Sequence, residues 1–154
     1  MSNGRNPAEY PLPAFYFRVV FAGFPDMDTS FQEVSGIRSE IEFEEVAEGG
    51  ENRHVHRLPK AVKHSVLSLK RGITGKKSSL VKWCKSVMEG DFSKPIRPME
   101  VKVYLLDENN SPVSGWSFAN AYPVKWEIDG FNSTKNEVAI ETIELVYNNL
   151  ERII

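Results

Sequence analysis

The chain has 154 residues, of which 41% are hydrophobic and 26% are charged, and its formal net charge is −2. This is enough apolar sequence for one domain with a sizeable core, and the charge balance excludes a disordered polyelectrolyte. The chain also lacks the basic stripe of a nucleic-acid-binding protein, and its single cysteine, Cys84, excludes an intrachain disulfide.

The first residues predict an exposed arm rather than a targeting sequence. Residues 1–12 are rich in Asn, Gly and Pro and contain no apolar run, so we expect no secretory signal. Assembly is therefore expected in the cytoplasm. No stretch approaches the roughly 18 uninterrupted apolar residues of a membrane span, so we expect no membrane insertion. The sequence thus predicts a single domain over residues 1–154 with a flexible N-terminal segment at residues 1–12.

The first strand is predicted over residues 14–22, where apolar and polar side chains alternate. Phe15, Phe17, Val19 and Phe21 fall on one face, because successive side chains of a strand point to opposite sides. A turn follows, and further strands are expected over residues 31–35 and 37–46. Gly36, which separates them, is a candidate β-bulge.

The strand predicted after Gly36 carries three glutamates on one face. Ile37, Ser39, Ile41 and Phe43 share the opposite face. The glutamates, here called the acidic row, are Glu40, Glu42 and Glu44. Neighbouring carboxylates repel one another, so the acidic row must face water or a cationic partner. A regular solvated row provides no asymmetry for acid–base catalysis, which needs two different carboxyl environments.

Residues 47–60 are predicted to form an extended polar loop, too long for a tight hairpin. Loops of this length are uncommon in compact domains unless they are functional or mobile. A contact role is therefore expected for it, and its candidate contact residues are Glu48, Gly49, Gly50, Glu51, Arg53, His54 and Arg57.

A strand over residues 65–73 precedes the one predicted helix, over residues 78–89. Leu80, Val81, Cys84, Val87 and Met88 recur at helical spacing and form one apolar face. A serine can cap the start of this helix, and Gly90 can end it. Cys84 lies on the apolar face, where a free cysteine behaves as a small hydrophobic residue rather than a nucleophile.

Three more strands are predicted over residues 99–106, 116–126 and 136–147, where aromatic and β-branched residues dominate. The elements show no βαβ alternation, so the sheet should be mostly antiparallel. The predicted fold is mainly β, an antiparallel two-sheet β-sandwich or barrel with one packed helix.

Other patterns carry little chemistry. His54 and His56 have H-x-H spacing and His64 follows, but Arg53 and Arg57 beside them oppose metal binding. Residues 72–77 lack the four-residue gap of a phosphate-binding loop. The three tryptophans can serve a core, a subunit interface or carbohydrate stacking.

Three segments together resemble the tail tube proteins of the T4-like phage family, including the inner-tube proteins of contractile injection systems. They are an aromatic Phe-x-Phe-x-Val strand at residues 10–19, an F-x-E-V-S-G-L-like signature at residues 31–37, and N-E-V-A-I-E-T-I-E at residues 136–144. An L-K-R-G strand end at residues 69–72 and a W-x-x-x-x-A-x-P motif at residues 116–123 strengthen the resemblance, which covers about residues 10–147. The longer turn at residues 23–29 departs from the pattern, as expected of a paralogue.

The resemblance implies a structural subunit that stacks as hexameric rings around a shared β-barrel lumen, with no enzymatic activity and no cofactor. It implies as partners a sheath, a baseplate hub and spike, a tube terminator, and protein cargo or DNA in the lumen. Within this scheme the acidic row and Lys70 are expected to face the lumen, and the 47–60 loop is expected to contact the next ring. A phage tail and an injection system both remain open.

Three alternatives remain at this point. One is an Hcp-like tube protein of a type VI secretion system, and another is a tube-initiator or adaptor paralogue. The third, from a different class, is a carbohydrate-binding β-sandwich that uses its tryptophans.

Overall fold

The computed structural model describes residues 16–24, 30–47, 55–73, 78–90, 95–129 and 139–154. These residues form ten strands and one helix, and every strand pairing is antiparallel. The strands are β1 (Tyr16–Phe21), β2 (Ser30–Phe31), β3 (Glu33–Ser35), β4 (Ser39–Ala47), β5 (Val55–His64), β6 (Leu67–Gly72), β7 (Met99–Leu106), β8 (Pro112–Ile128), β9 (Ile140–Val146) and β10 (Asn149–Arg152), and the helix is α1 (Ser79–Glu89).

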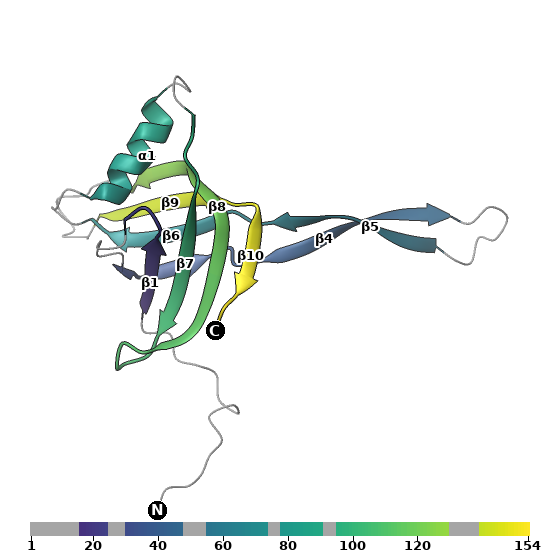
Figure 1. Cartoon of the computed structure of the whole chain (residues 1–154), viewed down its shortest axis with the longest axis horizontal. Coiled ribbons are helices and arrows are strands. Elements are labelled where there is room, and N and C mark those ends of the chain that lie inside the picture. The colour runs from purple at the N-terminus through teal and green to yellow at the C-terminus, as the bar shows by residue number, and fades with distance from the viewer. Residues whose placement is uncertain (1–15, 25–29, 48–54, 74–77, 91–94, 130–138) are drawn as a thin grey trace, which may run out of the picture.

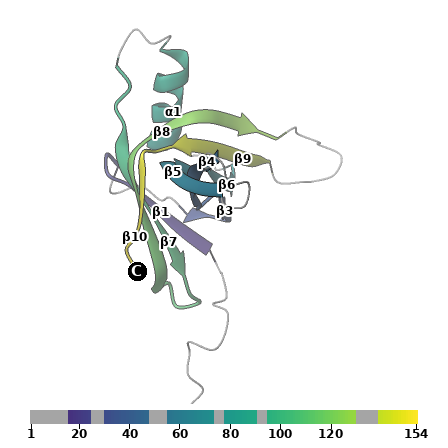
Figure 2. The same cartoon turned by 90° about the vertical axis from the view of Figure 1, so that its right-hand side faces the viewer.

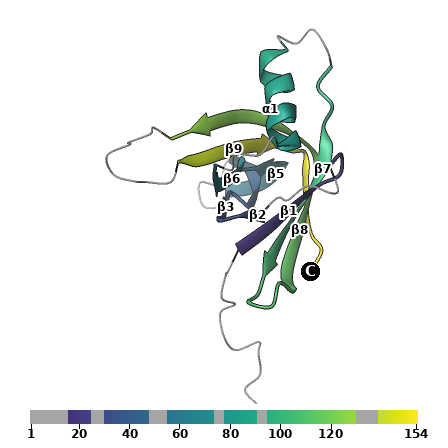
Figure 3. The same cartoon turned by 90° about the vertical axis from the view of Figure 1, so that its left-hand side faces the viewer.

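Eight strands form one hydrogen-bonded sheet that folds into two layers. The order is β2-β1-β7-β8-β9-β6-β3, and β10 also pairs with β8. Layer A consists of β1, β2, β7, β10 and the first part of β8, and layer B consists of β3, β6, β9 and the last part of β8. The strands of the two layers run in different directions, as Figures 2 and 3 show. The predicted antiparallel, mainly β fold with one helix is confirmed.

The strand β8 passes from layer A to layer B at a bulge. The register between β7 and β8 shifts between Met99 and Val101, so that two residues of β8 lie opposite one of β7. Asn120 in this bulge has φ 53°, a conformation that asparagine tolerates better than most residues. Because a bulge bends its strand and increases the local twist, the next residues of β8 leave β7 and pair with β9.

The hydrophobic core lies between the layers and under α1. Its members are alternate residues of paired strands, as the predicted alternation requires. They include Val19, Phe21, Leu67, Leu69, Val101, Val103, Phe118, Ile143 and Leu145 from the strands and Leu80, Trp83 and Cys84 from the helix.

The helix α1 forms and ends where the sequence predicts. Ser78 is its N-cap, and the Oγ atom of Ser78 accepts a hydrogen bond from the backbone N–H of Val81 at 3.4 Å. Leu80 and Cys84 are buried against the core, so the expected core position of Cys84 is confirmed. The helix ends at Glu89, before Gly90.

The thiol of Cys84 is expected to make folding less favourable at alkaline pH. Burial, with a smaller contribution from the Glu141 carboxylate, raises the pKa of Cys84 from 9.0 to about 12. Between pH 9 and 12 the folded protein keeps the Cys84 proton that the unfolded chain loses. The free energy of unfolding therefore falls as pH rises, by at most about 1.4 kcal/mol per pH unit from this group. Denaturant unfolding of the wild type and of Cys84→Ala from pH 8 to 11 measures this loss of stability. If the free energies of unfolding of the two proteins changed in parallel with pH, the prediction would be wrong.

Three sequence predictions need correction. Residues 55–60, expected within a polar loop, belong to strand β5, which pairs with β4. The strand expected over residues 31–35 is divided into β2 and β3, and the next strand begins at Ser39. Strand β10 was not expected, because its short polar sequence has no periodicity and only its pairing with β8 makes it a strand.

The strands β4 and β5 form a separate two-stranded sheet, here called the arm, that projects away from both layers (Figure 1). Two-stranded hairpins are only marginally stable alone in water. The arm therefore depends on contacts at its base or on a partner.

Candidate functional site

The solvent-facing side of layer B is polar and crosses four strands. Glu33 of β3 lies opposite Lys70 of β6, Lys70 lies opposite Thr142 of β9, and Thr142 lies opposite Glu127 of β8. A second row runs beside the first and consists of Ser35, Ser68, Glu144 and Lys125. We call these eight residues the polar face; Thr142, at its centre, is only 7% exposed. The alternate residues of β6 and β9 point into the core, so the polar face is the outer side of the layer.

The polar face carries charges of both signs, from Glu33, Glu127, Glu144, Lys70 and Lys125. The Nζ atom of Lys125 lies 3.1 Å from a carboxylate oxygen of Glu127. The hydrogen bond to Glu127, followed by the charges of Glu127 and Glu144, raises the pKa of Lys125 above its ordinary value. The face is therefore hydrophilic without presenting one uniform charge.

Both edges of layer B are open among the described residues. Strand β3 is the last strand of the hydrogen-bonded order, and β8 pairs only with β9 from Tyr122 to Ile128. Val124 and Trp126 lie on this part of β8, and Trp126 is 41% exposed. Open edges with exposed apolar side chains invite pairing with another chain.

The arm extends the edge hairpin of layer B. Ser35 pairs with Ser68 at the end of β3, and Ser39 pairs with His64 at the start of β4, with no residue inserted on either strand. Regular alternation would put both pairs on one side, but Ile37 and His64 pack toward the core, so the side chains change sides between the two pairs. Gly36 stands between the two pairs with φ 87°, and a Cβ atom there would lie 1.9 Å from the carbonyl oxygen of Val66. The predicted bulge at Gly36 is therefore wrong, because neither strand contains an extra residue there; Gly36 is instead a backbone irregularity that requires glycine.

One side of the arm continues the core side of layer B. At the base of the arm, the Oγ atom of Ser39 lies 3.2 Å from Nδ1 of His64. The His64 ring lies 5.1 Å from the ring of Tyr147, which packs edge-on against the core residue Phe118 with ring centroids 4.7 Å apart. Side chains on the same face of the arm as Ser39 therefore lie on the side that continues the core-facing side of layer B.

This side of the arm is apolar and exposed. Ile41 lies opposite Val62, and Phe43 lies opposite Pro59. Ile41 is 59% exposed and Phe43 is 52% exposed. We call these four residues the apolar stripe. Because such a surface is unfavourable in water, the apolar stripe is a candidate contact surface.

The acidic row lies on the opposite side of the arm, so the predicted alternation holds. Glu40 pairs with Arg38 at 3.1 Å, and Glu42 pairs with Lys63 at 3.8 Å. Ile37 and His64 pack toward the core, so the opposite side of the arm, which carries the acidic row, continues the polar face of layer B with Lys70. The structure thus brings the acidic row and Lys70 to one side of the extended hairpin, but in two separate sheets.

The candidate contact residues of the 47–60 segment divide into two groups. Glu48, Gly49, Gly50, Glu51, Arg53 and His54 lie outside the described residues. Arg57 lies in β5, where its guanidinium sits 5.2 Å from the ring centre of Phe43 and its Nε atom lies 3.8 Å from a Glu45 carboxylate oxygen. Arg57 is therefore part of the arm rather than of a loop.

Sequence reasoning missed most of the polar face, including Glu33, Thr142, Glu144 and Glu127. The alternation at residues 140–146 was the available signal, because it separates buried from solvent-facing side chains.

No group of three His, Cys, Asp or Glu side chains among the described residues is arranged to hold a metal ion. The described part of the chain contains no helix long and apolar enough to span a bilayer.

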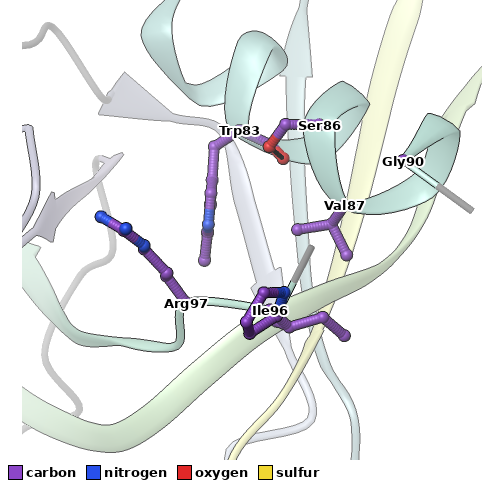
Figure 4. Close-up of a pocket in the computed structure, with 7 residues that line it drawn as sticks. Trp83, Ser86, Val87, Gly90, Ile96 and Arg97 are labelled. Atoms are coloured by element: carbon purple, nitrogen blue, oxygen red, sulfur yellow. Dashed lines mark hydrogen bonds between the residues drawn. The ribbon is translucent and has the colours of Figure 1, made fainter. Parts of the chain in front are cut away.

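A small cavity lies between α1 and the segment that leads into β7. Its volume is about 520 Å³, and its lining comprises Trp83, Ser86, Val87, Gly90, Pro95, Ile96 and Arg97 (Figure 4). Trp116 packs against the core and Trp83 is buried, so neither tryptophan forms an exposed stacking platform.

Comparison with known proteins agrees with this geometry. A structure from the anti-feeding prophage baseplate has 29% identity and a TM-score of 0.76, covering 94% of this chain and 97% of that one. A chain of the PVC extracellular contractile injection system, from its sheath-tube complex in the extended state, has 21% identity and a TM-score of 0.79, covering 94% and 93%. A type six secretion system protein has 12% identity and a TM-score of 0.62, covering 90% and 83%, and shares the fold.

No curated protein sequence matches the chain. The model of the family described as T4-like virus tail tube protein gp19 matches residues 13–151. That match covers the described strands and helix almost completely, including both layers and the arm. The chain therefore belongs to the T4-like virus tail tube protein gp19 family.

Proposed function

We propose that the chain is a structural subunit of the inner tube of a contractile, phage-tail-like injection system and has no catalytic role. Layer B carries this proposal, because it has a polar face on one side, a core on the other and two open edges. Six copies joined edge to edge close into a ring, which removes every open edge of the layer. Rings then stack into a channel for cargo.

The polar face lines the channel in this arrangement. Lys70 belongs to it, and the acidic row extends it along the arm. Each ring repeats these charges around the wall, and a narrow channel focuses their field. Since Lys125 and Arg38 pair with nearby carboxylates, much of the charge is compensated within each subunit.

The apolar stripe of the arm covers a neighbouring copy. It continues the core side of layer B, so it meets the core side of the next layer B, where Trp126, opposite the core residue Ile143, is exposed. The segment at residues 48–54 joins the two strands of the arm and is proposed to contact the next ring. The further partners are a surrounding sheath, a baseplate hub and spike, a tube terminator, and protein cargo or DNA in the lumen.

Electron microscopy of the purified protein tests ring formation, and a variant of the arm tests its basis. Ile41→Ser together with Phe43→Ser is expected to leave the subunit folded, because both side chains are largely exposed, and to reduce rings and tubes strongly. Met88→Ser, an exposed apolar position on α1, is the matched control and should assemble normally. Normal tubes from the double variant would remove the apolar stripe from the interface, and a strictly monomeric wild type would reject the proposed function.

Thiol labelling tests which face lines the channel. Ser68→Cys places a thiol on the polar face, and Lys85→Cys places one on the exposed side of α1. In assembled tubes, a maleimide attached to a large polymer is expected to label position 85 and spare position 68, while in dissociated subunits it labels both. Rapid labelling at position 68 in intact tubes would contradict the assignment.

A tube-initiator or adaptor at the baseplate is a second candidate. The 29% identity to a chain of the anti-feeding prophage baseplate structure favours it. The number of copies separates the two roles, because an initiator occupies few rings and a bulk subunit occupies the whole tube. Antibody labelling along intact particles measures this difference.

A further inference from the structure

The cavity beside α1 contains a buried hydrogen-bond donor with no partner. Trp83 is 7% exposed, and its ring is held edge-on by Phe21 at 5.9 Å and Phe24 at 6.3 Å between ring centroids. Its Nε1–H group makes no hydrogen bond to any described residue. A buried donor left unpaired is costly, so the indole favours an acceptor that enters from outside.

The other polar groups of the cavity show what kind of acceptor fits. The hydroxyl of Ser86 is already used, since it donates to the carbonyl oxygen of Trp83 at 2.8 Å. Arg97 is exposed and lies beside Trp83 at the cavity (Figure 4). The rest of the lining is mainly apolar, with Val87, Pro95 and Ile96. Two donors, one of them cationic, thus lie next to an apolar wall, which suits a carboxylate beside an apolar side chain.

The position of the cavity identifies the side from which such a group arrives. The helix α1 packs through Leu80 and Cys84 on the core side of layer B, opposite the polar face. If the polar face lines the channel, the cavity opens on the outside of the tube, so this inference rests on the proposed function. The outside of the tube is the surface that a sheath surrounds.

We propose that this cavity is a docking site for the sheath subunit and that it receives a sheath segment carrying an apolar side chain next to an Asp or Glu. The apolar side chain fills the space against Val87 and Ile96. The carboxylate pairs with Arg97 and accepts a hydrogen bond from Nε1 of Trp83. The occupied site satisfies the buried indole and desolvates the apolar lining.

Reconstitution with the sheath subunit of the same particle tests the site. Arg97→Gln and, separately, Trp83→Phe are expected to form bare tubes normally and to bind the sheath about tenfold more weakly, as loss of a charge-assisted hydrogen bond predicts. Arg97→Lys should retain part of the binding, and Lys85→Gln, elsewhere on α1, should retain all of it. The readout is the sheathed fraction of tube length in electron micrographs over a range of sheath concentrations.

A competition experiment identifies the chemistry. The peptide acetyl-Glu-Leu-Glu-Leu-Glu-amide is expected to inhibit sheathing of wild-type tubes and to have less effect on Arg97→Gln tubes, whereas its lysine counterpart should not inhibit. Equal inhibition by both peptides, or full sheathing of Arg97→Gln tubes, would overturn the docking site. Absence of bare wild-type tubes would instead reject the proposed function, so the two failures are distinguishable.

Discussion

Replacing Gly36 with alanine is expected to destabilise the subunit and to prevent tube formation. The residue has φ 87°, a left-handed conformation that costs a residue with a Cβ atom about 1–2 kcal/mol. The new Cβ atom would also lie 1.9 Å from the carbonyl oxygen of Val66, and both groups belong to the backbone, so no side-chain rotation relieves the contact. We expect the free energy of unfolding to fall by more than about 2 kcal/mol, as measured by urea denaturation.

The effect should extend to the orientation of the arm. Gly36 lies where the hairpin of layer B continues into β4 and β5, so a shift there moves the apolar stripe and the acidic row together. Gly23→Ala is the control, because its Cβ atom would meet only the flexible end of Met99 at 3.1 Å. A Gly36→Ala protein with wild-type stability and normal tubes would show that the junction tolerates a side chain.

Removing Arg71 is expected to cost about 3–5 kcal/mol of stability, the usual penalty for breaking a buried ion pair. The Nη2 atom of Arg71 lies 3.2 Å from a carboxylate oxygen of Glu141 and donates to the Oγ atom of Ser78 at 3.2 Å. The side chains of Arg71 and Glu141 are only 8% and 6% exposed. In Arg71→Met, the Glu141 carboxylate stays buried without its cation, and the N-cap of α1 loses a contact.

A double variant separates the pair from the packing around it. Arg71→Met with Glu141→Leu should recover much of the lost stability, because no unpaired charge remains in the core. Lys85→Met is the control, since it breaks an exposed pair with Glu89 and should change the free energy of unfolding by less than about 1 kcal/mol. An Arg71→Met protein as stable as this control would show that Glu141 is not held as a buried ion.

A loss of stability in α1 and in layer B is expected to affect both proposed interaction surfaces, the polar face and the cavity beside α1. Arg71 connects β6, β9 and the start of the helix, while the cavity with Trp83 lies farther along the same helix. The polar face occupies the other side of β6 and β9. A subunit weakened at Arg71 is therefore expected to lose tube assembly and sheath binding together, whereas Arg97→Gln separates them.

Local sequence pattern predicted most of the strands, the helix and which side chains share a face. Alternation placed Val19 and Phe21 in the core and set the acidic row apart from Ile41 and Phe43. Helical spacing located α1 and the buried position of Cys84. These features depend on the two backbone periodicities, which act over a few residues and are visible in the sequence itself.

Only the tertiary structure decided which strands pair and which surfaces remain open. Strand β5 contains a proline and several charged residues, so it shows no strand pattern until β4 lies beside it. The polar face needs β3, β6, β9 and the end of β8 side by side, and the bulge at Asn120 directs β8 to that position. Alternation fixes two faces for each strand separately, but long-range pairing determines which faces combine, and that depends on packing between residues far apart in the chain.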